Sequence, residues 1–465
     1  MSFNTYKNIK NEIKKYNNFI LTTCVDSIPA STEAIYINDG FDLYCYLNSE
    51  SRNVKQIEYN SKVEAVIYSG GHSRKQGLLF QGLAEPITDY DNEKKIKDKF
   101  ISKFNSMRAF IKSEDSTLIK ITPLEIKRID NKKINGNQVL KFRENNQTGL
   151  KTIIKSAGKW IKKWFNATRM GFSSTTIGAL ILGAGLAYHY SGNFAFNSGN
   201  NILWACLGAL FAHIASNLLN DYYDYKNGTD NLNSRPTSFT GGSRMIQNGI
   251  LSPDKILSVA WLFLLATIGI GLYLNSQLAG NWLLLIGAIG ILLVYFYSAP
   301  PIKLVERGLG EIAVGLGFST VIILGIFYVM TGRFAWTPVI ASIPLGILMF
   351  LMIFINEFQD EQFDRKAGKR HLVTRFKDKS KAVQLYKYLM FLPYLWVLGF
   401  AIGGLLPYYT LIVLLLLPLS LKAVSNATGN YDRNYELLQT NGLTIGIHIL
   451  FSILFTIGFL LDSLL

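Results

Sequence analysis

Two clusters of acidic residues, each at the end of a long apolar stretch, are the side chains of this sequence best suited to chemistry. The first contains Asp221, Asp224 and Asp230, and the second contains Asp360 and Asp364. Carboxylates are costly at membrane depth, so they seldom persist there without a function. Their oxygens are the ligands that Mg²⁺ prefers, and Mg²⁺ commonly shares its coordination shell with substrate phosphates. The two clusters therefore predict a membrane enzyme that binds a diphosphate through a metal ion.

The spacing within each cluster brings its carboxylates together. Asp221 and Asp224 lie three residues apart and Asp360 and Asp364 lie four apart, so each pair shares one face of a helix. We expect both pairs to act in catalysis and, with Asp230, to bind the metal. The neutral side chains expected to add an oxygen or to orient a carboxylate are Asn220 and Asn356.

Basic residues lie close to both clusters and would supply positive charge for a diphosphate. Glycines also follow each cluster, and they permit tight turns that expose backbone N–H groups to an anion. A single acidic pair at a membrane surface is usually only a solvated helix end, but here the pattern occurs twice with the same neighbours. The basic residues are Lys226, Arg235, Arg244, Lys303, Arg307, Lys369 and Arg370.

The elements that must position these residues are apolar runs that follow one another from residue 171 onward. Because about 20 residues cross a bilayer, the runs predict a polytopic all-α bundle of about nine transmembrane helices. Lys and Arg are concentrated in alternate connections, so the positive-inside rule places both acidic clusters in the cytoplasm. The runs cover residues 171–190, 201–219, 256–275, 282–299, 309–330, 337–355, 384–405, 408–424 and 441–461.

The N-terminal part is polar and Lys-rich, and its short β-rich runs predict a small closed barrel. It has no signal-peptide core, so we expect it to stay in the cytoplasm. Two helices are predicted, at residues 51–59 and 92–103. The strands are predicted at residues 19–23, 34–37, 43–47, 63–68, 78–83 and 118–121, separated by turn signals that include Gly70 and Gly71.

Residues 133–169 are predicted to bridge the two parts. Within them, residues 150–165 alternate Ile and Trp with Lys, a pattern typical of a basic amphipathic helix on a membrane surface. An ordinary solvated helix is the alternative. The predicted domains are therefore residues 1–132, 133–169 and 170–465.

Composition excludes several other classes of protein. The formal net charge is +15, which in a membrane protein reflects topology and anionic headgroups, so we expect a lipid bilayer and no nucleic acid as partner. The three cysteines are widely spaced and form no CxxC pattern, which argues against a disulfide framework or a zinc site.

The N-terminal part resembles the pyridoxamine 5′-phosphate oxidase-like split barrel. The resemblance covers most of residues 5–132 and rests on residues 19–23, 42–47, 51–57, 82–87 and 119–123. It implies FMN as a cofactor, with Arg52 and Lys55 at its phosphate, and a homodimer that forms through the barrel. The alternative is a barrel that binds nothing, in which both residues are solvated helix charges.

Residues 170–465 resemble the UbiA superfamily of intramembrane prenyltransferases. The match rests on residues 220–230, 241–244, 297–303, 307–311 and 356–370, although Glu357 stands where many relatives carry Asn or Asp. The resemblance implies a Mg²⁺-dependent prenyltransferase that ionises a polyprenyl diphosphate, with Lys303 stabilising the leaving group. The tyrosines Tyr295 and Tyr297 would shield the cation.

The acceptor implied by this resemblance is aromatic. The spacing of the first cluster looks most like the 1,4-dihydroxy-2-naphthoate branch of menaquinone biosynthesis. The alternatives are 4-hydroxybenzoate, a lipid ether or a haem precursor. Two other classes of protein are alternatives. The first is a transporter, but the acidic residues lie at helix ends, which argues against it. The second is a membrane-tethered flavin-binding sensor, but such a protein would not need metal-binding motifs.

Overall fold

The computed structural model describes residues 3–68, 76–130, 139–142, 150–192, 199–233, 236–237 and 239–465. Three sequence predictions lie outside the described residues, namely the turn at Gly70 and Gly71, the Arg235 side chain and most of residues 133–149. The chain forms two compact units. Unit 1 contains Met1–Trp164 and Met245–Ser252, and unit 2 contains Phe165–Arg244 and Pro253–Leu465.

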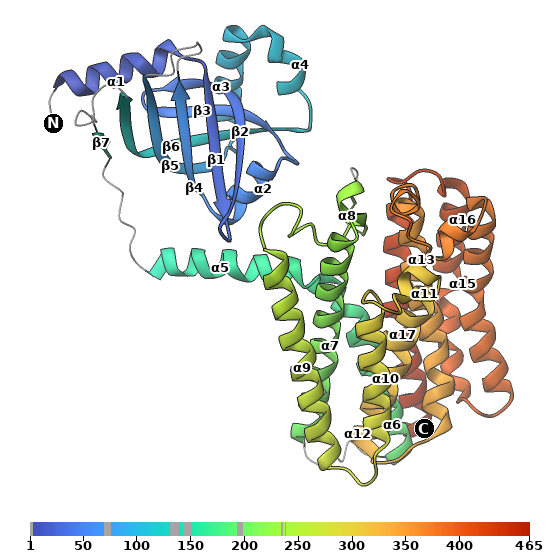
Figure 1. Ribbon diagram of the computed structural model, residues 1–465. Helices are drawn as coiled ribbons and strands as arrows, with labels where there is room; N and C mark the ends of the chain where they lie inside the picture. The colour runs from blue at the N-terminus through green and yellow to red at the C-terminus, as the bar shows by residue number, and fades with distance from the viewer. Residues whose placement is uncertain are drawn as a thin grey trace. The chain divides into compact units, whose positions relative to one another are not determined.

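Unit 1 is built on one antiparallel sheet in the order β3-β2-β1-β4-β5-β6-β7 (Figure 1). An additional pairing of β3 with β6 closes six strands into a barrel, which removes the exposed edges of an open sheet. The six predicted runs are confirmed as its strands. The bounds are β1 Asn18–Val25, β2 Ile28–Asp39, β3 Asp42–Asn48, β4 Lys62–Tyr68, β5 Gln76–Pro86, β6 Ser116–Asp130 and β7 Val139–Lys141.

Alternating side chains fill the barrel. The large residues Phe19, Tyr36 and Phe80 are fully buried inside it, as the two-residue period of a strand requires. The helix α1 was not predicted from the charged N-terminal segment, but its Ile9 and Ile13, one turn apart, are also fully buried. The helices of this unit are α1 Phe3–Lys15, α2 Arg52–Tyr59, α3 Tyr90–Lys103, η1 Asn105–Met107 and α4 Arg108–Ile111.

The predicted basic helix is present as α5 Leu150–Ala167, which begins in unit 1. The side chains of Ile154, Trp160 and Ile161 are each about 60% exposed. Because large apolar side chains are usually covered, this exposure suits a helix whose apolar face meets a membrane surface.

Unit 2 is helical. Eight helical segments among the described residues are long and apolar enough to cross a membrane, and α10 is a shorter apolar helix of 15 residues. Together they account for the nine predicted runs. The bounds are η2 Met170–Phe172, α6 Ser173–Ser191, α7 Gly199–Lys226, α8 Thr229–Leu232, α9 Pro253–Ser276, α10 Trp282–Phe296, η3 Leu304–Arg307, α11 Gly310–Gly315, the π-helix η4 Leu316–Val321, α12 Ile322–Thr331, α13 Trp336–Lys366, α14 Leu372–Arg375, α15 Lys379–Ile402, η5 Tyr408–Leu416, α16 Leu417–Asn430 and α17 Leu437–Leu464.

Small residues let the helices of unit 2 approach closely. On α6, a Cβ added at Gly178 would lie 2.7 Å from Ser452 Oγ on α17, the kind of close packing that small residues permit in membranes. The helices α7 and α13 are 28 and 31 residues long. They extend past their apolar segments, and their last turns carry the acidic clusters except for Asp230, which lies on α8.

Candidate active site

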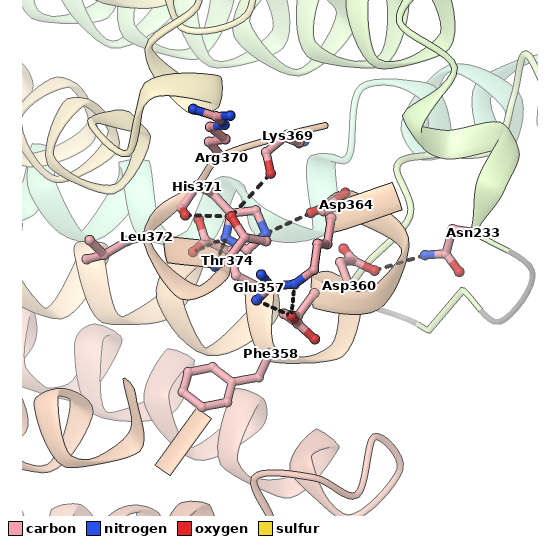
Figure 2. A network of polar contacts seen from close by, with 12 residues as sticks. Asn233, Glu357, Phe358, Asp360, Asp364, Lys369, Arg370, His371, Leu372 and Thr374 are labelled. Carbon is pink, nitrogen blue, oxygen red and sulfur yellow. Dashed lines mark hydrogen bonds and ion pairs between the residues drawn. The ribbon is translucent and has the colours of Figure 1, made fainter. Parts of the chain in front are cut away.

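The last turns of α7 and α13 line one polar cavity of about 110 Å³. The four carboxylates predicted from sequence that line it are Asp224, Asp230, Asp360 and Asp364, and Asp221 lies beside it, paired with the lining residue Arg169. The structure thus brings together two clusters that are at least 130 residues apart in the sequence. Figure 2 shows part of this network, in which Asn233 Nδ2 donates to Asp360 Oδ1 at 2.9 Å.

Glycines that end the two helices make this arrangement possible. Gly228 follows α7 with φ +79°, and Gly368 follows α13 with φ +78°, a left-handed conformation that glycine adopts without a steric penalty. After Gly368, the N–H of Lys369 donates to the Asp364 carbonyl at 2.9 Å. The chain therefore turns back, and Lys369 and His371 come to lie beside the carboxylates of their own helix.

Asp221 is held by a basic residue that the sequence analysis did not single out. Arg169, just before η2, forms an ion pair with its carboxylate. The backbone N–H of Ser243 lies 3.3 Å from both carboxylate oxygens of Asp221. At the adjacent Gly242, with φ +74°, an added Cβ would lie 2.5 Å from Asp230 Oδ2. Only glycine lets the backbone approach these two carboxylates so closely.

Asp224 is the centre of a second set of contacts. Lys369 Nζ lies 3.2 Å and 3.4 Å from its two oxygens. Asn220 Nδ2 donates to Asp224 Oδ2 at 3.0 Å and lies 3.1 Å from Ser298 Oγ. Burial alone would lower the pKa of Lys369, but Asp224 and Asp364 outweigh it and hold that pKa well above its ordinary value. Lys369 is therefore a permanent cation inside the cavity.

Asp230 lies on α8 and is 5% exposed. Burial, reinforced by the charges of Asp224 and Asp221, raises the pKa of Asp230 to about 7. Arg244 Nη1 donates to the Asp230 carbonyl at 2.5 Å and to the Asn233 carbonyl at 3.4 Å. The structure thus places Arg244, predicted to bind the substrate, against the backbone of α8 and of the residue that follows it.

A buried histidine joins the acids of α13. His371 is 1% exposed, and its Nδ1 lies 3.0 Å from Glu357 Oε2 while its Nε2 lies 3.1 Å from Asp364 Oδ2 (Figure 2). Burial alone would lower the pKa of His371, but these two carboxylates raise it to about 9. The imidazolium therefore bridges Glu357 and Asp364 and fixes the orientation of the latter.

Glu311 completes this buried layer. It is fully buried, and its Oε1 accepts a hydrogen bond from the Leu372 N–H at 2.7 Å. Ligand atoms of Glu311, Glu357 and His371 lie within 4.8 Å of one another. Because both ring nitrogens of a protonated His371 face carboxylates, this group is better described as a salt-bridge cluster that supports Asp364 than as a metal site.

The cavity carries an excess of negative charge. Six carboxylates in and beside it face three basic groups, Arg169, Lys369 and His371. Buried charges of one sign require counter-ions, and carboxylate oxygens are ligands for hard cations. The arrangement therefore suits divalent cations. The carboxylates are Asp221, Asp224, Asp230, Glu357, Asp360 and Asp364.

Several predicted site residues are absent from the lining of this cavity within the described part of the chain. Lys303 Nζ lies 3.0 Å from Glu306 Oε1 and 3.3 Å from Asn227 Oδ1. Lys226 Nζ lies 5.8 Å from the centroid of the Tyr222 ring. The Arg307 guanidinium donates to the Pro301 carbonyl at 3.1 Å, and Arg370 accepts a hydrogen bond at its carbonyl from Arg375 at 2.9 Å.

Four of the residues predicted to bind the substrate do line it, namely Asn220, Tyr297, Asn356 and Lys369. Asn356 faces the cavity and accepts a hydrogen bond from Asn441 Nδ2 at 2.5 Å. Tyr297 lines it as well, and also lines a larger, mostly apolar cavity of about 550 Å³ between α7, α9, α10, η4 and α12. The two cavities therefore adjoin at Tyr297, so that one extended ligand with a polar head and an apolar tail fits both.

Sequence comparison identifies relatives for both units. Residues 177–436 match the UbiA prenyltransferase family, and residues 6–130 match Pyridoxamine 5′-phosphate oxidase. The chain is similar to a 1,4-dihydroxy-2-naphthoate octaprenyltransferase of Bacillus subtilis, with 30% identity over 232 residues, 49% of this chain and 70% of that protein. A 2-carboxy-1,4-naphthoquinone phytyltransferase of Synechocystis is 25% identical over 274 residues, 58% of this chain and 84% of that protein.

The barrel has relatives of known structure. A putative pyridoxamine 5′-phosphate oxidase from Listeria innocua covers 27% of this chain and 98% of its own length, with 23% identity and a TM-score of 0.23. The family match to residues 6–130 and the six closed strands confirm the split barrel predicted from sequence. The match of residues 177–436, more than half of the chain, to the UbiA family confirms the resemblance predicted for residues 170–465. The chain belongs to the UbiA prenyltransferase family, and it is a multi-pass membrane transferase.

Proposed function

We propose that this protein transfers a polyprenyl group from polyprenyl diphosphate to 1,4-dihydroxy-2-naphthoate, with Mg²⁺ as cofactor. The observation that carries the proposal is the polar cavity with its excess of carboxylates, which adjoins an apolar cavity at Tyr297. Such a pair of cavities accommodates a charged head group and an isoprenoid tail. Two relatives whose names specify naphthoate or naphthoquinone substrates support the choice of acceptor.

The residues present fit a divalent metal. The cavity has an excess of negative charge, and its oxygen donors come from two opposing helices and from α8. When bound, Mg²⁺ would neutralise charge on the diphosphate and on the leaving group. The residues that would hold it are Asp221, Asp224, Asp230, Asp360 and Asp364.

The cationic side chains of the cavity would stabilise the departing diphosphate. Lys369 and Arg169 each form an ion pair with an aspartate, and both line the cavity that the diphosphate would occupy. As the allylic C–O bond breaks, its electron pair leaves with the diphosphate, and a fixed cation stabilises the charge that develops there. Lys303, on the loop before η3, is proposed to assist from the rim, where Glu306 now holds it.

The apolar cavity would hold the isoprenoid tail and keep water away from the allylic cation, which would otherwise be hydrolysed. Tyr297 lies at the junction of the two cavities, where its π face would stabilise the cation. Tyr295 stays a second candidate for this role.

The acceptor is tested by its by-product. If the ring attacks through the carbon that bears the carboxyl group, the β-keto acid that results loses CO₂. Protein in membranes is given Mg²⁺, a labelled polyprenyl diphosphate and a panel of acceptors. Prenylation of dihydroxynaphthoate with release of CO₂ in equal amount is expected. Efficient use of 4-hydroxybenzoate, a lipid ether or a haem precursor, with dihydroxynaphthoate inert, would replace this acceptor.

We also propose that the barrel and both acidic clusters lie in the cytoplasm, as the distribution of Lys and Arg suggests. In a background without Cys24, Cys45 and Cys206, Lys303→Cys is expected to resist a membrane-impermeant thiol reagent added outside. Leu278→Cys, between α9 and α10, is expected to react. The reverse pattern overturns the orientation.

For the barrel we propose FMN binding at the start of α2, within a homodimer. Ser51 caps this helix through a hydrogen bond of 3.5 Å from the Val54 N–H. Lys55 is now paired with Glu50 at 2.8 Å, so a phosphate would have to displace Glu50. The Arg52 guanidinium packs against Gly249, which belongs to the same unit, so closely that a Cβ at position 249 would clash with it.

The FMN proposal is tested on the full-length protein by fluorescence titration. The double variant Arg52→Glu with Lys55→Glu is expected to weaken binding at least tenfold, while Lys62→Glu, on the exposed face of β4, leaves it unchanged. Equal affinity of all three proteins, or no binding by the wild type, contradicts the proposed site. Light scattering of the same samples tests the homodimer, and a monomer at all concentrations refutes it.

A further inference from the structure

The apolar cavity contains one histidine that the proposed chemistry has not used. His213 lies on α7, is 3% exposed and lines this cavity. Its Nδ1 lies 2.9 Å from Thr176 Oγ1 on α6. Its ring packs edge-on against Phe318 of the π-helix η4, with centroids 5.2 Å apart. Its Nε2 has no hydrogen-bond partner among the described residues.

An unpaired ring nitrogen in such a place is costly. Burying a polar atom without a partner costs about 1–3 kcal/mol, and the wall around His213 is mostly made of Gly, Ala, Val, Leu and Ile. Thr176 holds one side of the ring, so the nitrogen on the other side is fixed in position. A buried nitrogen in this arrangement is suited to form a hydrogen bond with a hydroxyl or carbonyl group of a bound ligand.

The position of His213 along α7 indicates which ligand. It lies eight residues before Asp221 on the same helix, which corresponds to about 12 Å along the axis. The diphosphate would occupy the level of Asp221, and the tail would extend past His213 into the cavity. We place the ring that attacks the first carbon of the tail in the space between these two levels.

We propose that His213 Nε2 binds the acceptor hydroxyl next to the carboxyl group and holds its proton during ring attack. This inference rests on the proposed function. If Thr176 accepts a hydrogen bond from Nδ1–H, the neutral imidazole presents Nε2 as an acceptor. His213 is then the general base of the transfer, and a catalytic residue in its own right.

The steps balance. The allylic C–O bond breaks, and its electron pair leaves with the diphosphate. The ring carbon forms a bond to the allylic carbon, the hydroxyl becomes a ketone, and its proton passes to Nε2. Loss of CO₂ returns the electron pair of the broken C–C bond to the ring, and the resulting enolate oxygen takes the proton back. No net proton is released, so a buried base without a path to water is sufficient.

A second histidine offers a matched control. His448 on α17 is fully buried, and neither of its ring nitrogens has a partner in the described ranges. It does not line the apolar cavity. If a buried histidine served only to fill space, His213→Gln and His448→Gln would have similar effects.

The test combines a variant with a modified acceptor. Full-length protein in membranes is assayed with Mg²⁺, polyprenyl diphosphate and either dihydroxynaphthoate or its methyl ether at the hydroxyl next to the carboxyl group. General-base groups typically contribute 10²–10⁴-fold to the rate. We therefore expect His213→Gln to lower kcat with dihydroxynaphthoate at least about a hundredfold, with an unchanged KM for the prenyl diphosphate. His448→Gln should retain the wild-type rate.

The methyl ether separates chemistry from structure. It has no proton to transfer, so the wild type should use it slowly and His213→Gln should lose little further rate with it. The inference is overturned if His213→Gln loses the same factor in rate with the methyl ether as with dihydroxynaphthoate, so that the two effects are independent. It is also overturned if His213→Gln is as fast as the wild type. If His213→Gln does not accumulate in membranes, Thr176→Val is tested in its place. Without the hydrogen bond from Thr176 the imidazole ring is no longer held, so kcat should fall about tenfold. An unchanged kcat would refute the role of His213.

The proposed function and this inference fail differently. A wild-type protein that uses only another hydroxylated aromatic acceptor refutes the dihydroxynaphthoate proposal, and the same comparison is then made with that acceptor and its methyl ether. Absence of transfer to every hydroxylated aromatic acceptor overturns both.

Discussion

Replacing Lys369 with methionine separates the two tasks that the cavity assigns to this residue. Its ammonium lies 3.2 Å from Asp224 Oδ2, where it would compete with a metal ion for the same carboxylate. During transfer the same charge would stabilise the departing diphosphate. Lys369→Met keeps most of the side-chain volume and removes only the charge.

The expected magnitude follows from burial. The Lys369 side chain is 12% exposed, so water screens its charge little. Removing one preorganised group that stabilises a developing charge costs about 10²–10³-fold in kcat. Mg²⁺ binding without substrate should tighten, however, because a competing cation has been removed from Asp224.

The assay measures prenyl transfer in membranes and Mg²⁺ binding to the purified protein by calorimetry. Lys366→Met is the control, since Lys366 lies on the exposed side of α13 only three residues away. We expect the control to match the wild type in both measurements. A Lys369→Met variant within tenfold of wild-type kcat, or one whose Mg²⁺ binding weakens together with kcat, refutes this account of Lys369.

Three further predictions follow from the charged groups of the cavity. Because the pKa of Asp230 is raised to about 7 and the metal binds the ionised form, Mg²⁺ affinity should fall as pH drops below 7; Asp230→Asn should flatten this dependence in a calorimetric titration, and an unchanged slope contradicts it. The folded-state pKa of His371 is about 9 against an ordinary 6.5, so its stabilisation is complete below about 6.5 and is lost as pH rises through 9; melting temperatures in detergent should show this loss for the wild type but not for His371→Gln. Arg169→Gln leaves the buried Asp221 carboxylate unpaired and should cost about 3–5 kcal/mol of stability, seen as a lower melting temperature in EDTA that Mg²⁺ partly restores; equal melting curves would show that the ion pair is unimportant.

The sequence was most informative where the physical signal is local. Hydropathy over about 20 residues marks a spanning helix, so the nine apolar runs coincide with helices of the structure, and the short alternating runs coincide with the strands of the barrel. The acidic clusters were visible for the same reason, since three- and four-residue spacing along a helix defines a face.

The sequence was least informative where contacts join distant residues. Arg169 pairs with Asp221 across 52 positions, and no local spacing marks it. His371 follows Asp364 by seven positions, but a glycine turn and not helical periodicity brings it back to its carboxylates. Spacing alone also could not separate Lys369, which lines the cavity, from Lys303 and Arg370, which do not. These distinctions depend on how the loops fold over the helix ends.

The central claim is tested most directly by following the carboxyl carbon of the acceptor. Dihydroxynaphthoate labelled at that carbon is incubated with polyprenyl diphosphate and membranes that contain the wild type or Asp360→Ala. With Mg²⁺ the wild type should release one labelled CO₂ for each prenylated naphthoquinol, and Asp360→Ala or EDTA should reduce both by orders of magnitude. Full transfer in EDTA or by inserted Asp360→Ala, or prenylation without loss of the label, would contradict the account.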